Sequence, residues 1–169
     1  FSLFDLMRTE LSRTAEGWLY SAFLLAFAIK VPLVPFHTWL PDAHTEAPTA
    51  GSVILAGLLL KTGMYAILRF AFPLFPMAAR LSMPLLMVLG LTGFFYGAWV
   101  AMAQGDVKRL VAYSSIAHMG LVMIGLAVWN TMTVSGAVLQ MVNHGLTTSA
   151  LFMLVGMLDE RTHSRELAT

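Results

Sequence analysis

Four basic side chains lie near the middle of long apolar stretches of this chain, where charged groups are rare. They are Lys30, Lys61, His118 and His144. A charge at the centre of a bilayer costs roughly 3 kcal/mol on insertion scales, so such groups are usually functional. Burial disfavours the charged form of a lysine, and histidine titrates close to neutral pH. Four such residues at similar depth predict a row of groups that bind and release protons.

Each of these residues also has a purely structural interpretation. A single intramembrane histidine often only joins two helices by hydrogen bonds, and this interpretation stays open for His118 and for His144. Lysine side chains can extend toward water, but Lys30 and Lys61 are each about ten residues or more from either end of their stretch, too far for one side chain. The four residues taken together favour a function.

The apolar stretches that carry these residues are long enough to cross a membrane, which takes about 20 mostly apolar residues. The last three of the qualifying segments contain no Asp, Glu, Lys or Arg. The sequence predicts an all-α, polytopic transmembrane bundle over 17–158. An extramembrane or interfacial segment (1–16) precedes it, and a water-facing tail (159–169) follows it. About five helices are expected, over 17–40, 48–72, 81–103, 110–129 and 131–158.

Composition supports an integral, multi-pass membrane protein in contact with a lipid bilayer. Of the 169 residues, 58% are hydrophobic and 11% are charged, with a mean hydropathy of +0.76. A soluble domain carries about 25% charged residues. The net charge is +1 without a basic run, so nucleic acid is not an expected partner. The absence of cysteine excludes thiolate zinc sites and iron–sulfur clusters held by this chain alone.

Two prolines lie shortly after the first of the two lysines. Pro32 and Pro35 have no amide donor, so the sequence predicts that the helix carrying Lys30 is broken there. A broken helix is tolerated in a bilayer only where protein or a water-filled cavity surrounds it, and transporters build midplane sites from such helices. A kink of this kind can also be purely architectural. The adjacent lysine favours a functional break.

The motif "HTWLPDAH" brings His37, Asp42 and His44 close together in the sequence. These residue types could suggest a metal site. Their spacing crosses a proline-bounded turn and matches no standard ligand pattern, so no metal is expected. We interpret the segment as a loop that caps helices or admits protons, with His37 and His44 as candidate residues for proton uptake or gating.

Three segments also carry a specific, ordered pattern. They read "KVPLVPFHTWLPDAHTEAPTAGSVILAGLLLKTGMYAILRF" (30–70), "GDVKRLVAYSSIAHMGLVMIGL" (105–126) and "NHGLTTSALFMLVG" (143–156). This pattern resembles the antiporter-like membrane subunits of respiratory complex I, a proton-pumping NADH:quinone oxidoreductase, and most closely its M-type, or chain 4-type, members. The resemblance covers about residues 16–166. It indicates an internal fragment of a longer chain.

The resemblance implies a role for each of the four basic residues. Lys30 matches the lysine of the broken helix, Lys61 the lysine that links it onward, and His118 and His144 the histidines of a central polar axis. Protons would pass along these groups, coupled to quinone reduction. No redox chemistry is expected on this chain, because NADH, FMN, the iron–sulfur clusters and quinone would bind elsewhere in the complex.

The resemblance also implies partners and a location. The partners would be other membrane-arm subunits, including neighbouring antiporter-like subunits, in a bacterial plasma membrane or an equivalent energy-coupling membrane. The segments "PDAHTEAP", "QGDVKRL" and "DERTHSR" would all face the cytoplasm or its equivalent.

Three other functions remain as alternatives. Multi-subunit cation/proton antiporters and membrane-bound hydrogenases share much of the pattern. A b-type cytochrome could use His118 and His144 as axial haem ligands, although two lysines at the same depth are not what a haem needs. A passive helical scaffold is a further possibility, against which the row of titratable groups argues.

Overall fold

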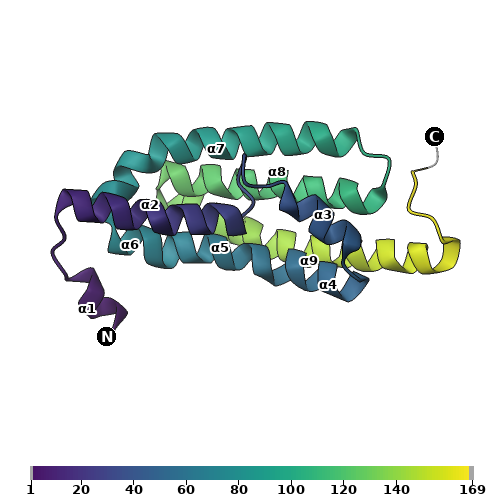
Figure 1. Ribbon diagram of the computed structural model, residues 1–169, viewed down its shortest axis with the longest axis horizontal. Coiled ribbons are helices and arrows are strands. Elements are labelled where there is room, and N and C mark those ends of the chain that lie inside the picture. The colour runs from purple at the N-terminus through teal and green to yellow at the C-terminus, as the bar shows by residue number, and fades with distance from the viewer. Residues whose placement is uncertain (1, 168–169) are drawn as a thin grey trace.

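The computed structural model describes residues 2–167; residue 1 and residues 168–169, at the outer ends of the two predicted flanking segments, lie outside it. The long helices run beside one another along the longest axis of the molecule (Figure 1). The predicted all-α membrane bundle is confirmed. Its elements are α1 (Leu3–Met7), α2 (Arg13–Lys30), α3 (Trp39–Glu46), α4 (Thr49–Ile54), η1 (Leu55–Leu59), α5 (Leu60–Ala66), η2 (Ile67–Ala71), α6 (Phe72–Leu74), α7 (Pro76–Met102), α8 (Val107–Val128) and α9 (Thr131–Thr162).

Four helices of the described chain are long and apolar enough to cross a membrane. They are Thr49–Leu74, Pro76–Met102, Val107–Val128 and Thr131–Thr162. The first of these is one continuous helix made of α4 to α6, with two π-helical turns, η1 and η2, inside it. The last extends beyond residue 158, so the start of the predicted water-facing tail is helical.

The predicted first crossing, 17–40, is divided between two helices. Helix α2 ends at Lys30, turns follow over 31–38, and α3 begins at Trp39. The two helices lie one after the other on the same side of the bundle (Figure 1). The indole nitrogen of Trp39 donates a hydrogen bond of 2.9 Å to the backbone carbonyl of Ile29, so a side chain satisfies one carbonyl at the end of α2.

The beginnings of the long helices are fixed by polar side chains. Asp106 accepts hydrogen bonds from the backbone amides of Lys108 and Arg109 in the first turn of α8, at 2.7 and 3.2 Å. Asn130 and Thr133 form a capping box at the start of α9. Helix α7 has no cap of its own, and Glu16 of α2 caps it instead, accepting from the backbone amides of Met77 at 2.8 Å and Ala78 at 3.1 Å.

Helices α7 and α8 pack closely because glycines face each other between them. A Cβ atom on Gly120 would lie 2.6 Å from the backbone nitrogen of Phe94, and one on Gly97 would lie 2.7 Å from that of Ala117. Small residues allow transmembrane helices to approach at backbone distance. This contact holds α8, which carries His118, in a fixed place beside α7.

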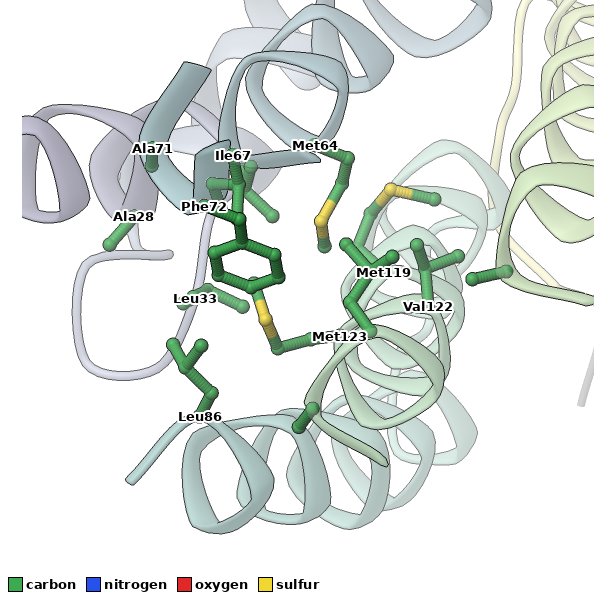
Figure 2. Close-up of a cluster of buried hydrophobic side chains, with 14 of the residues drawn as sticks. Ala28, Leu33, Met64, Ile67, Ala71, Phe72, Leu86, Met119, Val122 and Met123 are labelled. Atoms are coloured by element: carbon green, nitrogen blue, oxygen red, sulfur yellow. The ribbon is translucent and has the colours of Figure 1, made fainter. Parts of the chain in front are cut away.

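The main apolar core joins the turn after α2 to the rest of the bundle. Figure 2 shows Leu33 from this turn beside Met64 of α5, Phe72 of α6, Leu86 of α7 and Met123 of α8. The turn after α2, the continuous Thr49–Leu74 helix, α7 and α8 therefore meet in one buried cluster. Their packing anchors the segment that breaks the first predicted crossing.

One end of the bundle carries a network of charged groups, which we call the polar end. The α3–α4 turn, the α7–α8 loop and the chain after α9 all lie there (Figure 1). This agrees with the common side that the resemblance implies for these three segments. The contacts are Asp42–Arg109 at 3.4 Å, Arg165–Asp106 at 3.7 Å, Arg165–Asp159 at 3.9 Å and hydrogen bonds from Arg165 to the Thr45 carbonyl and from Lys108 to the Ala47 carbonyl.

Candidate functional site

Lys61 and His144, which come from helices far apart in the sequence, are in direct contact. The Nζ atom of Lys61 on α5 lies 2.6 Å from Nδ1 of His144 on α9. The same ammonium group donates a hydrogen bond to the backbone carbonyl of Ala56 in η1. His144 is buried, and its second ring nitrogen, Nε2, has no hydrogen-bond partner within residues 2–167. The contact therefore joins a proton donor to a histidine with a second nitrogen that is free to pass a proton on.

The third member of this group is His118 on α8. Its ring centroid lies 5.2 Å from that of His144, with the two planes inclined by 59°. Nδ1 of His118 lies 3.1 Å from the side-chain nitrogen of Gln140 on α9. Three of the four basic residues singled out in the sequence are thus gathered into one continuous group, Lys61–His144–His118.

Two glycines allow the helices that carry Lys61 and His144 to come this close. A Cβ atom on Gly145 would lie 3.1 Å from the carbonyl oxygen of Gly57 and 3.7 Å from Cε of Lys61. Beside them, Ser149 of α9 donates a hydrogen bond of 3.3 Å to the carbonyl of Val53. Larger side chains at either glycine would push α9 away from η1, so the pair of glycines sets the Lys61–His144 distance.

Lys61 also lines an apolar groove between the Thr49–Leu74 helix and α9. The groove has a volume of about 520 Å³ and is bounded by Leu58, Lys61, Tyr65, Val142 and Leu146 among others. Among the described residues that bound the groove, Lys61 is the one basic side chain.

The structure does not bring Lys30 into this group. Lys30 is the last residue of α2 and is exposed in the described chain. The stem of its side chain lies against Gly63 of α5, where an added Cβ atom would be 3.2 Å from Cγ of Lys30. None of the ion pairs among residues 2–167 involves Lys30. The helix end places it next to Pro32 and Pro35, in the turns that follow α2.

The two histidines of the "HTWLPDAH" segment are both buried but point to different neighbours. His37 packs edge-on against Tyr96 of α7 at 4.8 Å, and His44 stacks on Phe152 of α9 at 4.4 Å. Asp42, between them in sequence, pairs with Arg109. Among the described residues no group of three or more His, Asp or Glu side chains is arranged to hold a metal ion.

Glu16 is a buried carboxylate that sequence reasoning placed outside the membrane. It lies at the α2–α7 contact, four residues before Tyr20, whose hydroxyl is 2.5 Å from the hydroxyl of Ser82 on α7. In the sequence, Glu16 and Tyr20 are one helical turn apart, on the helix face that also carries Phe23 and Phe27. This spacing indicates that Glu16 faces a neighbouring helix. It identifies a polar contact but not its partner.

The fold and the site define an integral membrane protein whose crossing helices carry ionisable groups in contact with one another. The whole chain, residues 1–169, matches a family described as "NADH:quinone oxidoreductase/Mrp antiporter, TM". It is 53% identical over 167 residues to the NADH-quinone oxidoreductase subunit M of Pseudomonas aeruginosa, covering 99% of this chain and 33% of that protein. The chain thus spans about a third of the length of the curated relatives it matches.

Solved structures with a similar fold include chains of complex I and of an Mrp complex. A chain of respiratory complex I from Thermus thermophilus with bound NADH superposes with a TM-score of 0.93 at 39% identity, covering 98% of this chain and 36% of that one. A chain of the Mrp complex from Dietzia sp. DQ12-45-1b superposes with a TM-score of 0.90 at 23% identity, over 98% of this chain and 31% of that one, which shows a shared fold. The chain belongs to the NADH:quinone oxidoreductase/Mrp antiporter transmembrane family, and the predicted resemblance to its M-type members is confirmed.

Proposed function

We infer that this chain is part of a proton-translocating membrane subunit of a complex I-type NADH:quinone oxidoreductase. The observation that carries this proposal is the continuous group Lys61–His144–His118 inside the bundle. The family and the subunit M relatives support it. The proposed partners are the other membrane-arm subunits, including neighbouring antiporter-like subunits. NADH, FMN, iron–sulfur clusters and quinone would be bound elsewhere in the complex.

The contacts suggest how a proton would move. The ammonium of Lys61 donates its proton to Nδ1 of His144 along the existing 2.6 Å contact, and His144 releases its other ring proton from Nε2. The number of protons on His144 is unchanged by this exchange. His118, 5.2 Å away between ring centroids, is the next acceptor, through rotation of a ring or one bridging water. Gln140 fixes the orientation of His118.

Lys30, at the helix break formed by Pro32 and Pro35, is proposed to be a further protonatable group of the same proton path, before Lys61. Lys30 is exposed among the described residues, and the stem of its side chain lies against Gly63 of α5. His37 and His44 are proposed to take up or gate protons.

The alternatives have less support. The Mrp-type likeness is a likeness of fold at 23% identity, against 39% for the complex I chain. For a b-type cytochrome, a haem would have to lie between His118 and His144, yet their rings are 5.2 Å apart and each has Nδ1 beside another side chain. A passive scaffold does not explain why a lysine lies in an apolar groove, because a charged group inside a membrane is costly.

Proton pumping by the full-length protein in its assembled complex tests the proposal. In sealed vesicles, NADH oxidation should acidify the lumen, and Lys61→Ala should abolish most of this acidification. An NADH-independent exchange of Na⁺ for protons would instead favour the cation/proton antiporter. A stoichiometric haem absorption that disappears in His144→Phe would favour the cytochrome. Native acidification by Lys61→Ala would contradict the relay.

A further inference from the structure

The helical turn just before Lys61, η1, contains one residue more than an α-helical turn. In a π-helical turn an amide bonds to the carbonyl five residues earlier, whereas in an α-helix it bonds to the carbonyl four residues earlier. The amide of Leu60 accordingly bonds to the carbonyl of Leu55. In an α-helix the same amide would bond to Ala56, which is fully buried. The carbonyl of Ala56 has therefore lost its α-helical donor.

Lys61 supplies a donor to this carbonyl. Its ammonium donates a hydrogen bond to the carbonyl of Ala56, five residues earlier, and the same nitrogen lies 2.6 Å from Nδ1 of His144. Buried backbone carbonyls are nearly always paired, because an unpaired one is costly. Among residues 2–167, no side chain donates in this way to a carbonyl of the second π-helical turn, η2. The π-helical turn and the lysine side chain thus form one unit at η1.

The two contacts of the Lys61 nitrogen suit a proton transfer in both directions. An ammonium has three N–H donors, and two of them are engaged, one by Ala56 and one by His144. When one N–H bond breaks and its proton binds Nδ1 of His144, a neutral amine remains. This amine still donates to the Ala56 carbonyl, so its new lone pair stays directed at the Nδ1 proton. The same geometry therefore serves the forward and the return step.

Packing against α9 holds η1 in the place that this geometry requires. The carbonyl of Gly57, inside η1, would lie only 3.1 Å from a Cβ atom on Gly145 of α9. Just before η1, the carbonyl of Val53 accepts a hydrogen bond of 3.3 Å from Ser149 of α9. The backbone of η1 is thus fixed directly against the helix that carries His144.

We propose that Ala56 is a positioning residue, whose carbonyl, released by η1, keeps the Lys61 nitrogen aligned with Nδ1 of His144 in both protonation states. The proposal rests on the proposed relay function and adds the backbone group that aligns its first step. It gives the π-helical turn a role that an α-helical turn of the same residues would not have, because there the carbonyl of Ala56 is taken by the backbone.

Deletion of Leu58, an exposed residue of η1, tests this role in the full-length protein and its assembled complex. The deletion removes the extra residue, so the carbonyl of Ala56 regains an α-helical donor. NADH-driven proton uptake by sealed vesicles should fall by about tenfold or more, because the transfer depends on alignment. The pH profile of pumping should also shift, since a hydrogen bond to the ammonium affects its proton affinity. Electron transfer from NADH to a water-soluble acceptor should stay at the native level.

The matched control is deletion of Arg69, an exposed residue of η2. It also removes one residue from a π-helical turn of the same helix, but beyond Lys61. Pumping and its pH profile should stay native. Native pumping after deletion of Leu58, or an equal loss after deletion of Arg69, would overturn the role of Ala56.

A second comparison does not depend on whether a deletion variant assembles. The amide of Lys61→Gln can donate to the carbonyl of Ala56, whereas Lys61→Met cannot. Amide hydrogen exchange over 55–61 in the assembled complex should therefore be slower in Lys61→Gln than in Lys61→Met. If the carbonyl needs no donor, methionine is the better residue for this apolar groove, and the reverse order would overturn the proposal.

The same variants separate this proposal from the relay itself. Lys61→Gln does not titrate and should lose pumping. If it does so while deletion of Leu58 leaves pumping native, the relay stands and the role of Ala56 falls. Native pumping by Lys61→Gln would overturn both.

Discussion

The ammonium nitrogen of Lys61 lies 2.6 Å from Nδ1 of His144, and this contact joins α5 to α9 in the interior of the bundle. The two residues are 83 positions apart in the sequence. The contact depends on backbone-distance packing of the same helices at Gly57 and Gly145. The candidate site is therefore a product of helix packing, and changes in packing should affect it as directly as changes in its own side chains.

Gly120→Ala should destabilise the α7–α8 contact and displace His118, two residues away. The added Cβ atom would lie 2.6 Å from the backbone nitrogen of Phe94, and backbone cannot move aside as a side chain can. Overpacking of this kind costs about 1–3 kcal/mol. The thermal unfolding temperature of the purified protein should fall. Gly136→Ala, where nothing lies within 4 Å of the new atom, is the control and should not lower it.

Lys30→Ala in the assembled complex should strongly reduce proton pumping and the coupled quinone reduction. Lys30→Arg should not restore either, because a guanidinium does not release its proton in a protein. Both rates are measured in the same vesicles. Near-normal pumping by the arginine variant would remove Lys30 from the proton path and leave it a structural residue at the end of α2.

Glu16→Gln should weaken the start of α7. The carboxylate of Glu16 accepts hydrogen bonds from the amides of Met77 and Ala78, and a charge-assisted cap of this type contributes about 1–2 kcal/mol. A lower unfolding temperature is expected. Glu10→Gln, at an exposed carboxylate that makes no ion pair or side-chain hydrogen bond among residues 2–167, is the matched control. Equal unfolding temperatures for the two variants would show that the cap is not needed.

Arg165→Ala should free the segment after α9 from the polar end. Arg165 contacts Asp106, Asp159 and the carbonyl of Thr45, and its backbone carbonyl accepts from Val107 at 3.0 Å. Exposed ion pairs contribute less than about 1 kcal/mol, so global stability should hardly change. Amide hydrogen exchange over 163–167 should become faster. Arg161→Ala, an exposed arginine with no ion pair in the described chain, should leave that exchange as it is.

Much of the bundle follows from the sequence, because apolar runs of sufficient length predict membrane helices almost independently of their neighbours. The break after Lys30 was likewise expected from the absence of amide donors at Pro32 and Pro35. The bounds were less predictable: α7 starts at Pro76 rather than near 81, since the cap that fixes its start comes from Glu16 on another helix.

The geometry of the site could be predicted only in part. Depth in the membrane can be counted along a sequence, and it singled out Lys30, Lys61, His118 and His144 as candidate residues. Of these, Lys61, His118 and His144 lie together in the structure. Which side of a helix faces which neighbour depends on packing between distant segments. For this reason the exposure of Lys30 and the complete burial of His44 were not foreseen.

A double-mutant cycle on Lys61 and His144 tests the proposed relay most directly. NADH-driven proton uptake would be measured for Lys61→Ala, His144→Ala and the double variant, each in the assembled complex. If the two residues pass the same proton along their 2.6 Å contact, removing the second should add little to the loss caused by the first. Losses that multiply in the double variant would contradict a shared relay and would show that the two residues act independently.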